Sequence, residues 1–169
     1  MRSSRMRRNC CLKLAGKIPV LECGASWILS GRNSWIDVFR EAVSGQPELK
    51  RLRFILLRMG GVCLVAPPKF DGDIPALLES GFLTNGPITV KIMKSSSCHQ
   101  NVASLWRSRK AGIVAIATGY ALSEDGLWRQ HSWGIRRDGI LETTEPREKY
   151  FGLVLQGSKA DRFAKCNPS

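Results

Sequence analysis

The sequence predicts a single α+β domain, in which an antiparallel sheet packs against a helix that carries a cysteine at its N-terminus. Three observations lead to this prediction. The chain has 169 residues, a length typical of one domain, and 43% of them are hydrophobic, which is enough to build a core. One segment has a strong helical pattern of apolar residues. Three consecutive segments near the C-terminus are typical of a strand meander.

The N-terminal segment is basic and contains no acidic residue up to residue 21. The whole chain has 26 Lys and Arg against 14 Asp and Glu, a formal net charge of +12. We expect residues 1–21 to form a poorly ordered arm and residues 22–169 to form the domain. The arm suits weak, nonspecific contact with nucleic acid or contact with an acidic partner. Its composition also fits an organelle-targeting peptide, or an upstream extension of the coding frame.

Cysteine and histidine usage bounds the chemistry. Six cysteines are scattered without a C-x-x-C pair, and no convincing secretory signal is present. Free thiols in a reducing compartment, by default the cytoplasm, are therefore expected. The only imidazoles are His99 and His131, so no metal site is predicted. No glycine loop has phosphate-cradling spacing, so no cofactor is expected, and no apolar run is long enough to span a membrane.

The first half of the chain gives weaker signals. Apolar residues at helical spacing predict a helix over residues 34–42. The run "LRFILLRMGGVCLVAPP" predicts two buried strands separated by its glycine pair. Asp73 precedes a short predicted helix that ends at Gly81. The alternation in "GPITVKIMK" predicts a strand with Ile88, Val90 and Ile92 on one side.

The clearest helix follows three serines, in "SSSCHQNVASLWRSRK". Ser97 and Gln100 have capping-box spacing, and Gly112 is expected to end the helix in the left-handed conformation. Cys98 then lies in the first turn, where the helix dipole lowers the pKa of a thiol. The neighbouring His99 points about 100° further round the helix, so it is expected to face solvent or the rim of a cleft.

The meander consists of "GIVAIATGYAL", "LWRQHSWGI" and "ILETTE", joined by the turns "SEDG" and "RRDG". If "RRDG" is a four-residue loop, Ile135 pairs with Ile140, and Glu142 lies diagonal to His131 and within reach. A loop formed by Asp138 and Gly139 alone would move Glu142 too far away, and a three-residue loop would put it on the wrong face. With the four-residue loop, Glu142 is expected to orient the imidazole of His131.

This order of groups resembles the papain-like and transglutaminase-like cysteine enzymes. Their pattern is a cysteine at a helix start, a strand histidine often written H-A-W, and an aspartate in D-x-T. The matching segments here are "SSSCHQN", "HSW" and "DGILETT", over about residues 95–145, with glutamate in place of aspartate. The resemblance implies Cys98 as nucleophile, His131 as base and Glu142 as orienting carboxylate. Such an enzyme attacks an amide or thioester bond of a peptide, protein or small molecule, as a protease, deamidase or transglutaminase-like transferase.

Further candidates lie beside these three residues. The backbone N–H of Cys98 is a natural donor to an oxyanion, and Gln100 or Asn101 could supply another. Gln100 also fits the role of capping partner, and Asn101 that of a surface residue. Trp133 and Thr144 are candidates for substrate contact. The oligomeric state is not predicted.

The same residues also fit roles without chemistry. A cysteine packs well as a small hydrophobe. Of Trp128 and Trp133, which alternate on their strand, one is expected in the core and the other in a cleft. The segment "WRSRK" mixes basic and aromatic residues as nucleic-acid-binding segments do, but such charges also pair with a helix C-terminus. The alternative function is therefore a non-catalytic basic domain that binds nucleic acid or an acidic protein.

Overall fold

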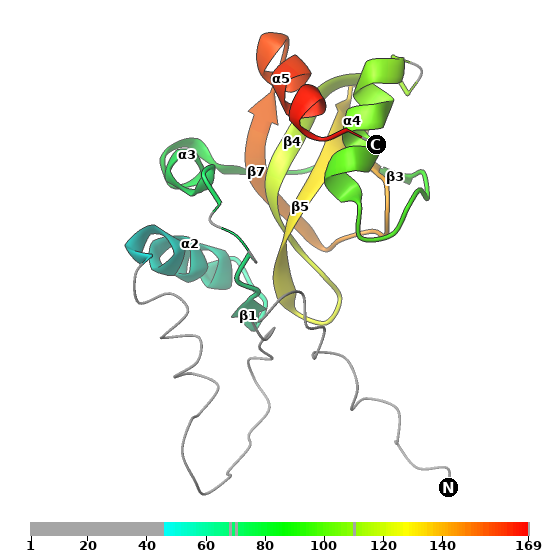
Figure 1. Ribbon diagram of the computed structural model, residues 1–169. Coiled ribbons are helices and arrows are strands. Elements are labelled where there is room, and N and C mark those ends of the chain that lie inside the picture. The colour runs from blue at the N-terminus through cyan, green and yellow to red at the C-terminus, as the bar shows by residue number, and fades with distance from the viewer. Residues whose placement is uncertain (1–45, 68, 70, 110, 169) are drawn as a thin grey trace, which may run out of the picture.

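A computed structural model describes residues 46–67, 69, 71–109 and 111–168 of the chain. The fold class is α+β, as predicted. Two pairs of helices, α2 with α3 and α4 with α5, pack against a curled sheet of seven strands (Figure 1). The predicted arm (residues 1–21), the predicted helix over 34–42 and the first part of the predicted domain lie outside the described residues.

The described elements follow the chain in the order α2 (Pro47–Arg58), β1 (Cys63–Leu64), α3 (Ile74–Ser80), β2 (Phe82–Thr84), β3 (Ile88–Val90), α4 (Cys98–Ser108), β4 (Ile113–Leu122), β5 (Leu127–Arg136), β6 (Gly139–Glu142), β7 (Lys149–Leu155) and α5 (Ser158–Cys166). The three long segments predicted as a meander form β4, β5 and β6. None of the helices in the described part of the chain has the length and apolar character needed to cross a membrane.

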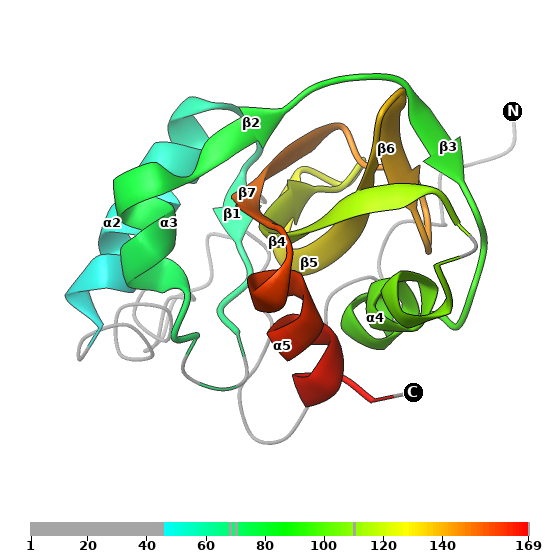
Figure 2. The same cartoon turned by 90° about the horizontal axis from the view of Figure 1, so that it is seen from above.

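The sheet has the strand order β2-β7-β4-β5-β6-β3, with β1 beside β5. The meander is antiparallel, but β1 and β3 join it in parallel, so the sheet is mixed rather than wholly antiparallel as predicted. Residues 85–87 alone connect β2 to β3, which stand at the two ends of the strand order. Because so short a connection has to join the two ends, the sheet curls round on itself (Figure 2).

The segment predicted as the first buried strand is a helix. Helix α2 has Pro47 in its first turn, where a proline costs nothing because the N–H has no helical partner. It buries Leu49, Leu52 and Leu56, whose spacing forms one helical face. The prediction counted the apolar run from Leu52 onward and missed the earlier part of this face. Of the second predicted strand only the short β1 forms.

Two shorter elements confirm the sequence prediction. Helix α3 follows Asp73 and is capped by Gly81, whose N–H donates to the carbonyl of Leu77. Strand β3 occupies the centre of the segment predicted from its alternation.

Helix α4 begins at Cys98, as predicted, but both of its ends differ from the prediction. Ser97 makes no side-chain capping bond, and its hydroxyl donates instead to the carbonyl of Ser95. At the other end Arg109, with φ of 53°, ends the helix in the left-handed conformation, and Gly112 is left-handed as predicted, with φ of 66°, but lies beyond the end of the helix. The helix therefore stops earlier than the glycine.

The two faces of the curled sheet are packed differently. The helices cover the outer face, which carries Trp128, while the concave face is filled by side chains of the strands themselves, including Trp133 and Tyr150. Both tryptophans are fully buried, which corrects the expectation that one of them lines a cleft. Trp133 fits because Gly152 stands beside it, where a Cβ atom would lie 2.7 Å from the indole ring.

Candidate active site

Cys98 lies at an open edge of β5. On the side away from β4, β5 pairs with β1 at residues 127–128 and with β6 at residues 134–136. Among the described residues, 129–133 have no strand partner on that side, and the half-buried thiol of Cys98 lies there. The backbone N–H of Ser132 donates a hydrogen bond to its sulfur. The first turn of α4 thus takes the place of a strand partner.

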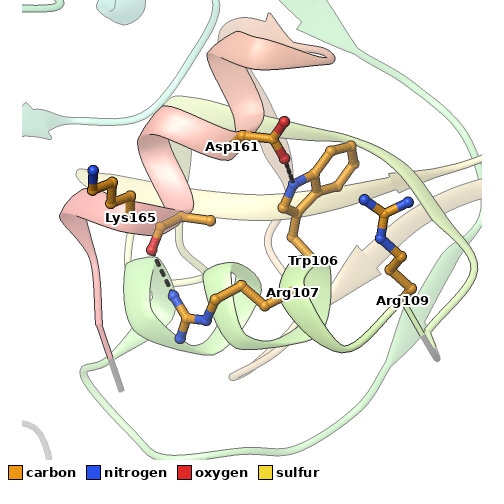
Figure 3. A pocket seen from close by; sticks show the side chains of 6 residues that line it. Trp106, Arg107, Arg109, Asp161 and Lys165 are labelled. Atoms are coloured by element: carbon orange, nitrogen blue, oxygen red, sulfur yellow. Dashed lines mark hydrogen bonds between the residues drawn. The ribbon is translucent and has the colours of Figure 1, made fainter.

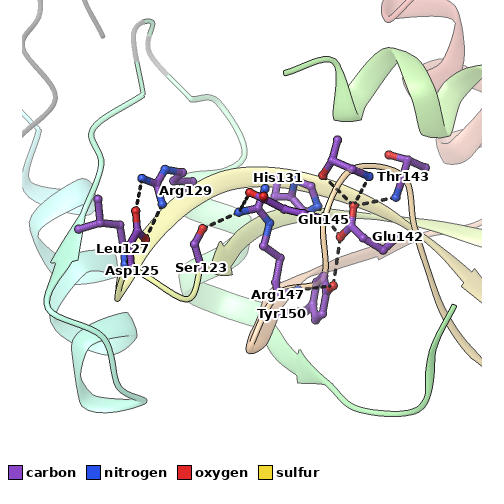
Figure 4. Close-up of polar contacts among 11 residues, drawn as sticks. Ser123, Asp125, Leu127, Arg129, His131, Glu142, Thr143, Glu145, Arg147 and Tyr150 are labelled. Carbon is purple, nitrogen blue, oxygen red and sulfur yellow. Dashed lines mark hydrogen bonds and ion pairs between the residues drawn. The ribbon is translucent and has the colours of Figure 1, made fainter. Parts of the chain in front are cut away.

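The loop after β5 has the register on which the site depended. Ile135 pairs with Ile140, which is the register predicted for the four-residue loop, although Arg136 and Gly139 also pair, so that only residues 137–138 lie between the two strands. Glu142 therefore lies diagonal to His131, and its Oε2 is 2.8 Å from Nε2 of the imidazole. Figure 4 shows the two side chains pointing toward each other. The predicted contact between them is confirmed.

The carboxylate of Glu142 is fully buried and saturated with donors. Its Oε1 accepts the N–H of Thr143 (2.7 Å) and both the N–H and the hydroxyl of Thr144 (2.9 and 3.0 Å). Its Oε2 accepts the hydroxyl of Tyr150 at 3.0 Å in addition to His131. Donors in this number stabilise the ionised form. Thr144 was expected to contact substrate, but here it holds Glu142.

The sulfur of Cys98 and the ring of His131 are hydrogen-bonded to each other. Because Nε2 of the ring is hydrogen-bonded to Glu142, Nδ1 is the ring nitrogen that remains to bond the sulfur. Burial by itself raises the pKa of Cys98, but the bond to His131, the positive charge of that ring and the N–H of Ser132 lower the pKa below its ordinary value. The N-terminus of α4 acts in the same direction.

The other two groups complete a charged chain. Burial opposes a charged His131, but the hydrogen bonds and negative charges of Cys98 and Glu142 raise its pKa to about 9. Burial also raises the pKa of Glu142, and the bond to His131, its positive charge and the backbone N–H groups of the loop lower it overall. These shifts act in the direction of a thiolate, an imidazolium and a carboxylate in a row.

Aromatic rings hold the imidazole in place. Trp133 stacks on His131, with 6.2 Å between ring centroids and 17° between planes, and Tyr150 packs against Trp133 at 5.0 Å. Since Trp133 is fully buried, it has no surface to offer a substrate, contrary to its place among the substrate candidates. It positions the histidine instead.

The oxyanion candidates have different surroundings. Asn101 is buried and donates from Nδ2 to the carbonyl of Lys94 at 2.7 Å, so it is not a surface residue and one of its two amide hydrogens is already bonded. Gln100 is exposed in the first turn of α4 and stays a candidate. The backbone N–H of Cys98 is the first of the helix and has no partner within it, so it is the best-placed donor.

His99 was expected to face solvent or the rim of a cleft, and it is half-buried against β5. Its Nδ1 lies 2.6 Å from the hydroxyl of Ser132, which in turn donates to Thr118 at 3.0 Å. These residues lie on the outer face of the sheet, opposite His131. Burial lowers the pKa of His99, and the positive charge of His131 lowers it further. His99 is therefore a neutral ring next to the site.

A second buried carboxylate lies on this outer face. Asp71 accepts the hydroxyl of Tyr120 at 2.9 Å and the amide of Gln130 at 3.0 Å on one oxygen, and the N–H of Asp73 at 3.0 Å on the other. Sequence analysis missed this group, and it also missed Tyr150. No local signal places Asp71 or Tyr150 beside β5, because strand order and loop packing decide both contacts.

The segment "WRSRK" serves the packing of α4 against α5. Trp106 donates from Nε1 to Asp161 at 2.8 Å, and Arg107 donates to the carbonyl of Ala164 at 2.5 Å, near the C-terminus of α5 (Figure 3). These residues line a surface pocket of about 340 Å³. The contact of Arg107 is the structural kind that a basic side chain makes with a helix C-terminus, whereas Trp106 bonds to Asp161 in the first turn of α5.

The cysteines of the described segments are in two states. Cys98 and Cys166 are free, and Cys63 is disulfide-bonded, which corrects the expectation of a free thiol there. Cys166 is exposed, whereas Cys98 is half-buried. The two free thiols thus provide an internal comparison of reactivity.

No protein-family model matches the chain, and no match to it was found among curated proteins or solved structures. The part of the chain that the structure describes contains no group of three or more His, Cys, Asp or Glu able to hold a metal ion.

Proposed function

We propose that the protein is a cysteine hydrolase or acyl transferase that attacks an amide or thioester carbonyl, in the manner of papain-like and transglutaminase-like enzymes. The observation that carries the proposal is the hydrogen-bonded chain from Cys98 through His131 to the buried Glu142. A nucleophile, a base and a group that orients the base are the three parts that such catalysis needs.

The first half of the reaction uses the charges already described. The Cys98 thiolate attacks the carbonyl carbon and forms a C–S bond, while the carbonyl electrons move to the oxygen. The N–H of Cys98 donates to this oxyanion. The imidazolium of His131 then gives its proton to the leaving nitrogen or sulfur as that bond breaks.

The second half decides between hydrolysis and transfer. Water or an amine attacks the acyl-enzyme, and His131 takes the proton of the attacking group. The thiolate then leaves, so the site returns to its starting state. Glu142 stays ionised throughout, keeps the ring oriented through Nε2 and stabilises its positive charge.

The test is acylation with p-nitrophenyl acetate near neutral pH, followed by mass spectrometry of the protein. We expect a burst of one nitrophenolate per chain and an acetyl group on Cys98. Cys98→Ala is expected to lose the burst, and Cys166→Ala is the matched control that keeps it. Iodoacetamide should label Cys98 at least about tenfold faster than Cys166, because lowering the pKa of a thiol by one unit raises its thiolate fraction about tenfold. Equal rates at the two thiols, with no acetyl on Cys98, would contradict the proposal.

The net charge of +12 favours the second candidate, a basic domain that binds nucleic acid or an acidic partner. It predicts affinity for DNA or RNA that falls steeply with salt and is lost when residues 1–21 are removed. Cys98→Ala would then leave binding unchanged. Affinity that does not change with salt would argue against this candidate.

A further inference from the structure

Strand β3 has an open outer edge. It stands at the end of the strand order and pairs only with β6 among the described residues. In this parallel pairing the N–H of Lys91 donates to the carbonyl of Glu142 at 2.8 Å. The N–H and C=O of the alternate residues Ile88 and Val90 therefore point to the outside. Such an edge is a template for pairing with another chain.

The same strand presents apolar side chains to solvent. Ile88, Val90 and Ile92 are 39%, 38% and 73% exposed, and they alternate along the segment. Exposed Lys91 and Lys94 follow the strand. Apolar side chains at alternate positions on an unpaired edge are typical of a surface that binds an extended peptide, and the lysines favour acidic side chains in that peptide.

The open edge is continuous with the candidate site. Val90 is the register partner of Glu142, and the N–H of Met93 donates to the carbonyl of Thr143 at 2.9 Å. The carbonyl of Lys94 is then held by Asn101, which lies in the first turns of α4. A chain that extends along β3 in the direction of Lys94 thus arrives at the end of the helix that carries Cys98.

The other end of the sheet lacks this connection. Strand β2 also exposes two apolar side chains, Phe82 at 49% and Leu83 at 37%. It pairs with β7, at the opposite end of the strand order from β3. Exposed apolar residues alone therefore do not distinguish the two edges, and the continuity with the site does.

We infer that the outer edge of β3 binds an extended segment of a polypeptide substrate as an additional strand and leads the chain to Cys98. The inference rests on the proposed function and narrows its substrate to polypeptides. Backbone pairing with Ile88 and Val90 supplies affinity, and the exposed apolar row favours apolar residues at alternate positions of the substrate.

The test compares two chloromethyl ketones that alkylate Cys98. One is a hexapeptide that alternates valine with glutamate and ends in glycine at the reactive group, and the other is the N-acetylglycine analogue. We expect the peptide reagent to alkylate Cys98 about tenfold faster or more, since about 1.4 kcal/mol of binding gives that factor. The same peptide with alternate amides N-methylated cannot pair as a strand and should lose the advantage.

Two variants at one position locate the effect. Val90→Pro removes an N–H that points outward and leaves the bonds to β6 in place, so it should reduce the peptide advantage to about threefold or less. Val90→Thr keeps the N–H and the β-branched side chain, so it should keep the advantage. The iodoacetamide rate at Cys98 should be the same in both variants and in the original chain.

The outcomes separate the inference from the proposed function. No peptide advantage, or one that survives both Val90→Pro and N-methylation, overturns the strand pairing while a fast iodoacetamide reaction still supports the nucleophile. Conversion of a dimer into a monomer by Val90→Pro, seen by sedimentation, assigns the edge to a second copy and also overturns it. A Cys98 no faster than Cys166 with iodoacetamide ends the proposed function itself.

Discussion

Two buried carboxylates contact opposite faces of β5, and their partners differ in kind. On the concave face, Glu142 bonds to His131, an ionisable base that is itself bonded to Cys98. On the outer face, Asp71 accepts from Tyr120 and Gln130, which are neutral donors. The first carboxylate therefore sets the charge of its neighbours, while the second ties the loop before α3 to the sheet.

The two histidines also differ between the concave and the outer face of the sheet. The pKa of His131 is raised to about 9 by the negative groups on both sides of its ring. The pKa of His99 is lowered, because burial and the charge of His131 outweigh the attraction of Asp71. Proximity to Cys98 is thus not what makes an imidazole suitable as its partner. A buried anion on the far side of the ring is the deciding feature.

The largest expected contrast is in stability. Glu142→Ala breaks a buried ion pair and leaves several donors unsatisfied, so it should cost about 3–5 kcal/mol of unfolding free energy. Asp71→Ala removes hydrogen bonds from neutral donors and breaks no ion pair, so it should cost about 1–3 kcal/mol. Urea unfolding of the two variants measures both values. Equal costs would remove the distinction between the two faces.

The pH dependence of stability tests the concave face alone. The folded pKa of His131, about 9, lies above its ordinary value of 6.5. Its contribution is therefore complete below pH 6.5 and is lost as the pH rises through 9. Glu142 has a lowered pKa, so its contribution is present above 4.5 and is lost at acid pH.

We expect a loss of about 3 kcal/mol of unfolding free energy between pH 7 and pH 10 that is attributable to His131. Urea unfolding of His131→Asn over the same range should lack this part of the decline. A His99→Asn variant should follow the original chain. If all three curves fall in parallel, the raised pKa of His131 is wrong.

Thiol reactivity sharpens the comparison between the histidines. His131→Ala should slow the alkylation of Cys98 by iodoacetamide at pH 7 about tenfold or more, because the thiolate loses its cation. His99→Ala should change the rate less than about threefold, because a neutral ring does not stabilise the thiolate. The rate at Cys166 in the same molecules is the reference. A greater effect from His99 than from His131 would reverse their assigned roles.

A matched pair of tyrosines gives the smallest expected effect. Tyr150→Phe removes one donor to Glu142, and Tyr120→Phe removes one donor to Asp71. Each should cost about 1 kcal/mol of stability, as for one hydrogen bond among several to the same carboxyl group. Only Tyr150→Phe should also change the alkylation rate of Cys98, by about twofold to threefold, through the altered charge balance at Glu142. An equal change in Tyr120→Phe would show that the rate follows stability.

The contact between His131 and Glu142 on the concave face was predicted from the sequence, whereas Tyr150 on the same face and Asp71 on the outer face were not. The contact between His131 and Glu142 follows from side-chain alternation and the length of one loop, which are local properties. The position of Cys98 follows from the start of a strongly patterned helix. By contrast, Asp71 and Tyr150 come from a loop and a strand whose places are fixed only by tertiary packing.

The errors at the level of secondary structure have a similar origin. In α2 the leucines look like a buried strand when only the second half of the run is counted, and tertiary contacts with one core cluster settle the helix. In α4 the capping box of Ser97 is possible by spacing, but its hydroxyl is used by the preceding loop. Local sequence patterns predict which contacts are possible, and tertiary packing decides which of them form.

The site also depends on Gly152 of β7, a strand that supplies none of the three reactive groups. Its missing side chain makes room for the indole of Trp133, and that indole supports the ring of His131. A useful signature for recognising proteins built on the same plan would therefore join this glycine to the cysteine, the histidine and the glutamate. Chains that carry the three reactive groups and a bulky residue at this point would have to seat their imidazole by other means.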